Sequence, residues 1–218
     1  MMKQKIIQHT IDFVKETLAV SESGHDWWHI YRVHKSAVKI AQNETGADLF
    51  VVELGALLHD IADSKFHAGN EEIGPQIAHN FLSTLNVEPS VIEQVVSIIK
   101  NISFKHSFTA EEKKSLELQI IQDADRLDAI GAIGIARAFS YGGYKMREMY
   151  NPEIKPVQYT CSDDYKKNTA PTINHFYEKL LLLKDQINTA YGRKLAIKRH
   201  KYMEEYLKHF YAEWEGEI

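Results

Sequence analysis

A nearly continuous apolar run at residues 49–58 is the feature that most constrains how this chain can fold. Its sequence is LFVVELGALL, and a helix that is apolar nearly all round is buried, so we expect residues 48–61 to form a core helix. The run leads directly into His59 and Asp60. An imidazole and a carboxylate at the end of a buried helix cost desolvation free energy unless a partner compensates them, and a metal ion is one such partner.

Apolar residues recur at helical spacing along most of the remaining chain. We find no alternating strand pattern of any length and no repeat at a fixed period. The sequence therefore predicts an all-α fold, organised as a single domain over residues 1–218. The expected helices cover residues 3–19, 26–43, 48–61, 71–85, 88–102, 110–128, 129–139, 172–189 and 192–213.

One stretch, residues 140–171, departs from the helical pattern. It contains Gly142, Gly143 and several X-Pro pairs, and its periodicity is weak. Loops of this length are uncommon inside compact domains and often act as lids or binding loops. We therefore expect a long loop or lid near residues 140–171.

The charge balance argues against two classes of partner. The 218 residues include 26 Lys and Arg against 30 Asp and Glu, which gives a net charge of −4, and no run of five like charges occurs. Neither a nucleic-acid-binding surface nor a membrane patch is expected. A local basic pocket for a small charged metabolite is compatible with this net charge.

Three further features predict a cytoplasmic protein. The single cysteine, Cys161, excludes an intrachain disulfide and fits a reducing compartment. No stretch of 18 apolar residues is present, so no membrane span is expected. The N-terminal residues lack the long apolar core of a signal peptide.

Candidate metal ligands gather on three of the expected helices. His25 and His29 open the second helix, four positions apart and therefore on one helix face. His59 and Asp60 end the buried helix. The helix at 110–128 carries three carboxylates within two turns, namely Asp123, Asp125 and Asp128.

These ligand types predict a particular kind of site. Packed helices lie about 8–10 Å apart, so side chains from three helices can converge on one ion. Two imidazoles and two carboxylates form a mixed nitrogen and oxygen site, which suits Mn²⁺, Fe²⁺, Co²⁺, Ni²⁺ or Zn²⁺ better than Ca²⁺. Four protein ligands on a six-coordinate ion leave two positions for water and a substrate oxygen. Such a site is hydrolytic, because the metal activates a water and polarises a phosphoryl oxygen.

Three motifs, HDWWHIYRV, LLHDIADSK and IQDADRLDAIGAIGIARAF, occur in this order. Together they resemble the HD-domain metal-dependent phosphohydrolase superfamily, and most closely its small stand-alone bacterial hydrolases. The resemblance covers about residues 20–140. It implies an HD-type helical bundle as the core of the domain, with the helices at about 172–213 packed on it.

The family pattern is a histidine, a His-Asp pair and a distal aspartate around a divalent metal. Carried over to this chain, it implies four ligands, which are His29, His59, Asp60 and Asp125. Asp125 is preferred because the family's distal aspartate directly precedes an Arg-Leu pair, while Asp123 and Asp128 are near alternatives. The chain lacks the Gly-Tyr-Pro element of two-metal members, so we expect one divalent ion. Mn²⁺ is favoured over Mg²⁺, Fe²⁺, Co²⁺, Ni²⁺ and Zn²⁺.

The chain also resembles the hydrolase half of alarmone synthetase/hydrolases, in which acidic residues follow the His-Asp pair. This likeness suggests that Asp63 orients the attacking water or acts as general base. Lys65 and Arg32 are candidate catalytic cations that would stabilise charge on phosphate oxygens. The candidate substrate-binding residues are Lys65, His67, His106, Tyr144 and Arg147.

Plainer roles stand beside these assignments. His25 begins a helix and contacts solvent in the alternative interpretation. In the alternative interpretation, Asp123 and Asp128 only cap the helix or pair with nearby arginines, Arg126 and Arg137. The residues that flank the paired glycines pack the long loop against the protein in the alternative interpretation; these are Tyr141, Tyr144, Arg147 and Tyr150.

The resemblance suggests a nucleotide as the phosphorylated small-molecule substrate. Cleavage of (deoxy)nucleoside triphosphates to monophosphate and pyrophosphate is our first prediction. A phosphomonoesterase acting on nucleoside monophosphates comes second, and alarmone or cyclic-nucleotide hydrolysis third. The competing class is a non-catalytic helical binding module with a structural metal, which a site filled entirely by protein ligands would favour. The sequence leaves open the base, the sugar, the cleaved bond and the oligomeric state.

Overall fold

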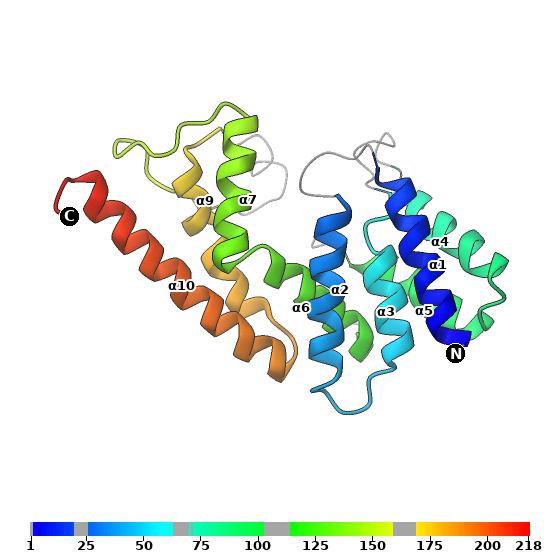
Figure 1. The fold of residues 1–218 in the computed structure, drawn as a ribbon. Coiled ribbons are helices and arrows are strands. Elements are labelled where there is room, and N and C mark those ends of the chain that lie inside the picture. The colour runs from blue at the N-terminus through cyan, green and yellow to red at the C-terminus, as the bar shows by residue number, and fades with distance from the viewer. Residues whose placement is uncertain (1, 20–25, 63–69, 71, 103–113, 159–168) are drawn as a thin grey trace. The chain divides into compact units, whose positions relative to one another are not determined.

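A computed structural model describes residues 2–19, 26–62, 70, 72–102, 114–158 and 169–218 (Figure 1). Regular structure in these ranges is entirely helical, which confirms the predicted all-α class. None of the described helices is both long and apolar enough to cross a membrane. The chain packs as two compact units, Met1–Asp125 and Arg126–Ile218, which we call the first and second unit. The single HD-type domain expected from the sequence stays a prediction.

The first unit is organised around the apolar helix α3 (Leu49–Leu58), eight of whose ten residues are buried. This helix contacts α1 (Met2–Thr17), α2 (Trp27–Ala41) and α5 (Pro89–Asn101). Two further helices lie in the described part of this unit. Helix α4 (Ile73–Thr84) packs on α5, and α6 (Leu116–Asp128) continues past the boundary at Asp125. Because α3 is enclosed by its neighbours, the residues that follow its last turn begin deep in the protein.

A glycine allows α3 and α6 to approach closely. A Cβ added at Gly55 would lie 2.6 Å from Cδ1 of Ile121, a distance that real Cβ atoms do not adopt. At its other end, α3 begins at the N-cap Asp48, whose carboxylate accepts the backbone N–H groups of Phe50 and Val51. The cap satisfies amide groups that have no partner within the helix.

The second unit contains α7 (Gly131–Tyr144), α9 (Thr172–Glu178), the 3₁₀ helix η3 (Leu180–Gln186) and the long α10 (Ala190–Trp214). Helix α7 contacts α9 and α10, and η3 also contacts both of these helices. The buried apolar side chains of the second unit include Ile173, Phe176, Leu180, Leu183, Ala196, Met203 and Leu207.

The predicted loop near 140–171 begins later than expected, because α7 extends to Tyr144. The paired glycines that suggested a loop lie inside this helix. A Cβ at Gly142 would stand 2.1 Å from Oγ1 of Thr172, so this glycine reflects the close approach of α7 to α9 rather than a break. Residues 145–158 and 169–171 are turn and coil, and 159–168 lie outside the described residues.

The helix expected at 172–189 is divided in two. Lys179, with φ −144° and ψ −57°, ends α9, and η3 follows it. Leu180 and Leu183 are buried, whereas Leu182 is half exposed. A 3₁₀ helix has three residues per turn, so it aligns Leu180 with Leu183 on one buried face. The run of four leucines is therefore compatible with either helix type, and packing selects the tighter one.

Candidate metal centre

His29 lies in the first turn of α2, where its backbone is fixed by a cap. Asp26 adopts extended backbone angles and accepts the N–H of His29 at 3.0 Å. The imidazole is almost completely buried, with 1% of the residue exposed. Asp26 is therefore the N-cap of α2, and it begins the helix so that the third residue, His29, turns inward.

His59 stands at the C-cap of α3, immediately after the buried leucines. Its Nδ1 lies 2.9 Å from the backbone oxygen of Ala56, one turn earlier in the chain. Because a carbonyl can only accept, Nδ1 carries the proton, and the lone pair of the neutral ring is on Nε2. This Nε2 atom is buried and makes no hydrogen bond within the described part of the chain.

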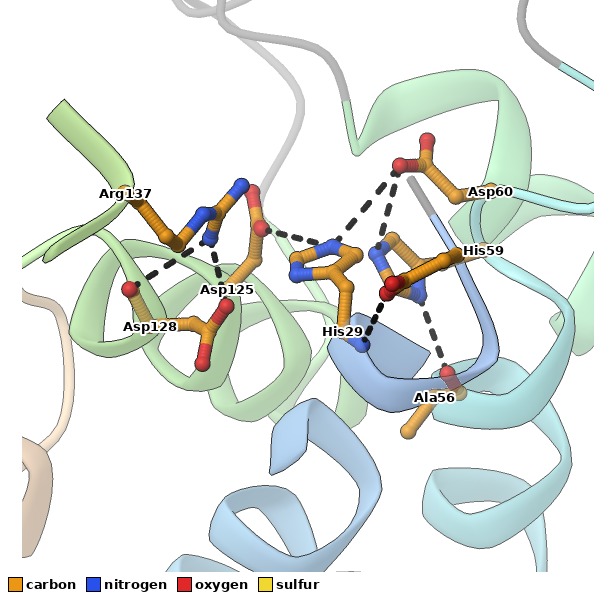
Figure 2. Close-up of polar contacts among 8 residues, drawn as sticks. His29, Ala56, His59, Asp60, Asp125, Asp128 and Arg137 are labelled. Atoms are coloured by element: carbon orange, nitrogen blue, oxygen red, sulfur yellow. Dashed lines mark hydrogen bonds and ion pairs between the residues drawn. The ribbon is translucent and has the colours of Figure 1, made fainter. Parts of the chain in front are cut away.

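Carboxylates from two elements face these imidazoles, as Figure 2 shows. Asp125 on α6 places Oδ1 3.5 Å from Nε2 of His29. Asp60 places Oδ2 3.8 Å from Nε2 of His29 and 4.0 Å from Nε2 of His59. The two imidazole rings meet edge to face, with centroids 5.4 Å apart.

This donor set fits a divalent cation. Ligand atoms of His29, His59 and Asp125 all lie within 4.8 Å of one another. The three N···O separations of 3.5–4.0 Å are longer than the 2.7–3.2 Å of an N–H···O hydrogen bond, so the imidazole and carboxylate groups stand around a common point without bonding directly to one another there. Two ligands about 2.1 Å from one ion lie at most about 4.2 Å apart, which side-chain shifts below 1 Å would achieve.

The comparisons with known proteins identify the family of this chain. The sequence pattern of the HD domain matches residues 27–130. The crystal structure of an HD-superfamily hydrolase from Bacillus thuringiensis has 44% sequence identity and a TM-score of 0.80, and the match covers 98% of this chain and 99% of that chain. This chain belongs to the HD superfamily.

Two further matches involve the uncharacterized protein YpgQ of Bacillus subtilis. YpgQ is 37% identical over 197 residues, which cover 90% of this chain and 87% of YpgQ. A crystal structure of YpgQ in complex with ADP matches with 36% identity, a TM-score of 0.75, and coverage of 96% of this chain and 95% of that chain. The predicted enzyme class, a metal-dependent phosphohydrolase of the HD superfamily, is confirmed by these relationships.

The three aspartates of helix α6 have different surroundings. Asp125 faces His29, whereas Asp123 is fully buried. Asp128 forms an ion pair with Arg137 of α7, with the two atoms 2.5 Å apart (Figure 2). The plainer role considered for Asp128 is thus the one observed, and the structure brings Asp125 to the candidate metal ligands.

The other predicted site residues are distributed more widely. Arg32 lies on α2, one turn after His29, and is partly exposed. Tyr144 ends α7 in the second unit, where Lys145 Nζ lies 4.9 Å from its ring centroid and Arg147 Cζ lies 5.7 Å from that of Tyr141. Four other predicted site residues lie outside the described residues, namely Asp63, Lys65, His67 and His106. The alternative ligand His25 also lies outside them.

Two groups that contact the candidate ligands or their helices were not identified from the sequence. The carbonyl of Ala56 selects the tautomer of His59, and a backbone group carries no residue-type signal. Arg199 of α10 donates to the backbone oxygen of Leu127 in the last turn of α6. The sequence shows only that Arg199 has few acidic residues near it in its helix, and this does not distinguish it from other basic surface residues.

Proposed function

We propose that this HD-superfamily protein is a nucleotide phosphohydrolase that converts (deoxy)nucleoside triphosphates to monophosphates and pyrophosphate. The observation that carries the metal dependence is the buried Nε2 of His59, whose lone pair faces a cluster of imidazole and carboxylate groups. A buried acceptor of this kind costs free energy unless a cation binds it.

In this proposal, one divalent ion is held by His29, His59, Asp60 and Asp125. A bound ion of this type supplies Lewis acidity and lowers the pKa of a coordinated water. The hydrogen bond from His59 Nδ1 to Ala56 fixes the ring so that its other nitrogen points at the ion site, as partners of metal-bound histidines usually do. The two carboxylates offset the positive charge. Mn²⁺ is the ion we favour for this mixed nitrogen and oxygen donor set.

The choice of a nucleotide is supported by the ADP complex of B. subtilis YpgQ, which is 36% identical over most of both chains. Asp63 remains our candidate to orient or deprotonate the attacking water, and Lys65 and Arg32 our candidates for the phosphate oxygens. The proposed substrate-binding residues remain Lys65, His67, His106, Tyr144 and Arg147. If Asp63→Asn left turnover unchanged, the role of Asp63 as base would be excluded.

Product analysis tests the proposal. The purified full-length protein is stripped of metal, supplied with Mn²⁺ or Mg²⁺, and incubated with a panel of nucleoside and deoxynucleoside tri- and monophosphates. Asp60→Ala is the test variant. Asp185→Ala is the matched control, because it removes a carboxylate whose side chain is 77% exposed on a different element, η3.

Metal-dependent release of pyrophosphate, lost in Asp60→Ala and retained in Asp185→Ala, is the expected result. Orthophosphate from monophosphates would replace the proposed reaction with that of a phosphomonoesterase. Binding of metal without turnover of any nucleotide in the panel would contradict the proposal and favour the non-catalytic binding module.

A further inference from the structure

The last turn of α6 is held by arginine side chains in addition to the backbone N–H groups of Ala129 and Ile130, which donate to the carbonyls of Arg126 and Leu127. The final four carbonyl groups of a helix have no partners within the helix itself. In α6 one of these groups belongs to Asp125, the proposed ligand, and two others accept hydrogen bonds from arginines. We call Arg137, Arg199 and the backbone of 127–128 the arginine clamp.

The first part of the clamp is a buried ion pair. Arg137 Nη1 donates to Oδ2 of Asp128 at 2.5 Å and to the backbone oxygen of the same residue at 3.3 Å. The side chain of Asp128 is only 3% exposed and that of Arg137 is 29% exposed. One guanidinium thus holds both the side chain and the main chain of the residue that ends α6.

The second part of the clamp comes from α10. Arg199 donates to the backbone oxygen of Leu127, and its stem passes Gly131 so closely that an added Cβ there would lie 3.0 Å from Cβ and Cγ of Arg199. Gly131 also has φ +76°, which favours glycine. Burial lowers the pKa of Arg199 and the nearby Asp128 carboxylate raises it, which fits a guanidinium enclosed beside that carboxylate.

Net stability is a poor explanation for such an arrangement. A buried ion pair pays a desolvation penalty that can exceed its Coulombic gain, and well-packed apolar residues often replace it without loss. The two guanidinium groups instead fix the orientation of the helix end, because each of them holds one backbone carbonyl in one position. A metal ligand must be held within about 0.5 Å of its productive geometry. Asp125 lies two and three residues before the clamped carbonyls, within the same helical turn.

We infer that Arg199 and Arg137 are positioning residues for the metal site: by fixing the last turn of α6, they hold the carboxylate of Asp125 in the geometry that binds a divalent ion. The inference rests on the metal site of the proposed function. It predicts that the clamp contributes to metal affinity even though neither arginine serves as a ligand.

A matched pair of variants on α10 tests this. Arg199→Met removes the donor to Leu127, whereas Arg193→Met removes a similar donor whose partner is the backbone oxygen of Ile187, a residue that is not part of α6. The affinity of the metal-free full-length protein for Mn²⁺ is measured by titration calorimetry. Arg199→Met should weaken Mn²⁺ binding by about tenfold or more, the usual effect of losing a group that orients a ligand. Arg193→Met should bind Mn²⁺ as wild type does.

Two additional variants and one additional measurement keep the test decisive if Arg199→Met folds poorly. Arg199→Lys retains the charge and one donor and should give an intermediate affinity. Gly131→Ala keeps every charge but displaces the stem of Arg199, and should also weaken binding. Amide hydrogen exchange at residues 124–130 should be faster in both Arg199 variants than in Arg193→Met, since a released helix end opens more often.

The outcomes separate this inference from the proposed function. If wild type binds no Mn²⁺, the metal site itself is wrong and the inference falls with it. If wild type binds Mn²⁺ and folded Arg199 variants bind it equally tightly, the metal site stands and the clamp is structural only. Equal weakening by Arg193→Met would also overturn the positioning role.

Discussion

Two polar clusters, one in each unit, balance their charges in different ways. In the first unit, the Nε2 atoms of His29 and His59 face the carboxylates of Asp60 and Asp125 at 3.5–4.0 Å. In the second unit, Asp128 is bound directly by Arg137 at 2.5 Å. The first cluster is rich in acceptors and is suited to an added cation, while the second already contains its cation.

The surroundings of buried histidines show the same contrast. His59 lies beside carboxylates, with Nδ1 tied to a carbonyl. His175 on α9 has its pKa lowered from 6.5 to about 4, first by burial and then by the positive charges of Lys179 and Arg147. A buried imidazole among cations stays neutral and serves packing, whereas one among carboxylates is placed to share a cation. The neighbours of a histidine therefore indicate its role better than its burial does.

The largest expected effect is on catalysis, and it comes from replacing one carboxylate oxygen of the first cluster with an amide group. Asp125→Asn removes a negative charge from the proposed ion site and should lower kcat/KM about a thousandfold, equivalent to about 4 kcal/mol of transition-state stabilisation. The free energy of unfolding of the metal-free protein should change by less than about 0.5 kcal/mol, because the side chain is 44% exposed. Steady-state kinetics and urea denaturation measure the two quantities. Unchanged kinetics would remove Asp125 from the site.

The same substitution one turn later should give the opposite result. Asp128→Asn removes the buried negative charge that pairs with Arg137 and should lower the free energy of unfolding by about 3 kcal/mol. At saturating Mn²⁺, kcat should stay close to the wild-type value. If Asp128→Asn instead lost turnover as severely as Asp125→Asn while keeping its stability, the contrast between the two clusters would be wrong.

Acid stability tests the role assigned to His175. Its pKa in the folded protein is below that of the unfolded chain, so the unfolded chain binds the extra proton between pH 6.5 and 4. The free energy of unfolding should fall across this window as pH decreases, by about 3 kcal/mol in total. Urea denaturation from pH 7 to 4 should show this loss in wild type and a smaller loss in His175→Gln. The exposed His209→Gln is the control and should behave as wild type.

The smallest expected effect concerns helix caps, whose removal should lower stability equally in the two units. Asp48→Ala at the start of α3 and Thr189→Ala at the start of α10 each remove a capping acceptor and should cost about 1 kcal/mol of stability. Mn²⁺ affinity should be unchanged in both, because Asp48 lies at the end of α3 opposite His59. A large loss of Mn²⁺ binding in Asp48→Ala would show that general helix stability, rather than local charge, controls the site.

Much of the helical architecture follows from local pattern. The apolar run at 49–58 predicted α3 within about three residues at its C-terminal end, since a continuous apolar segment leaves a helix no exposed face. The paired glycines led to a wrong prediction of where the loop begins. Gly142 lies inside α7 and allows the close approach of Thr172, so it does not mark a turn. The division at Lys179 was also missed, because four consecutive leucines fit both a 3.6-residue and a 3-residue period.

By itself, the sequence determined the all-α class, the burial of α3 and the delivery of His59 and Asp60 to the end of a buried helix, because these follow from residue types in consecutive positions. The resemblance added the family and the choice of Asp125. Only the tertiary structure decided that Asp128 pairs with Arg137, that Ala56 orients His59, and that Arg199 holds the last turn of α6. These outcomes depend on partners from other turns and other helices, and no local pattern records a distance between residues 72 positions apart.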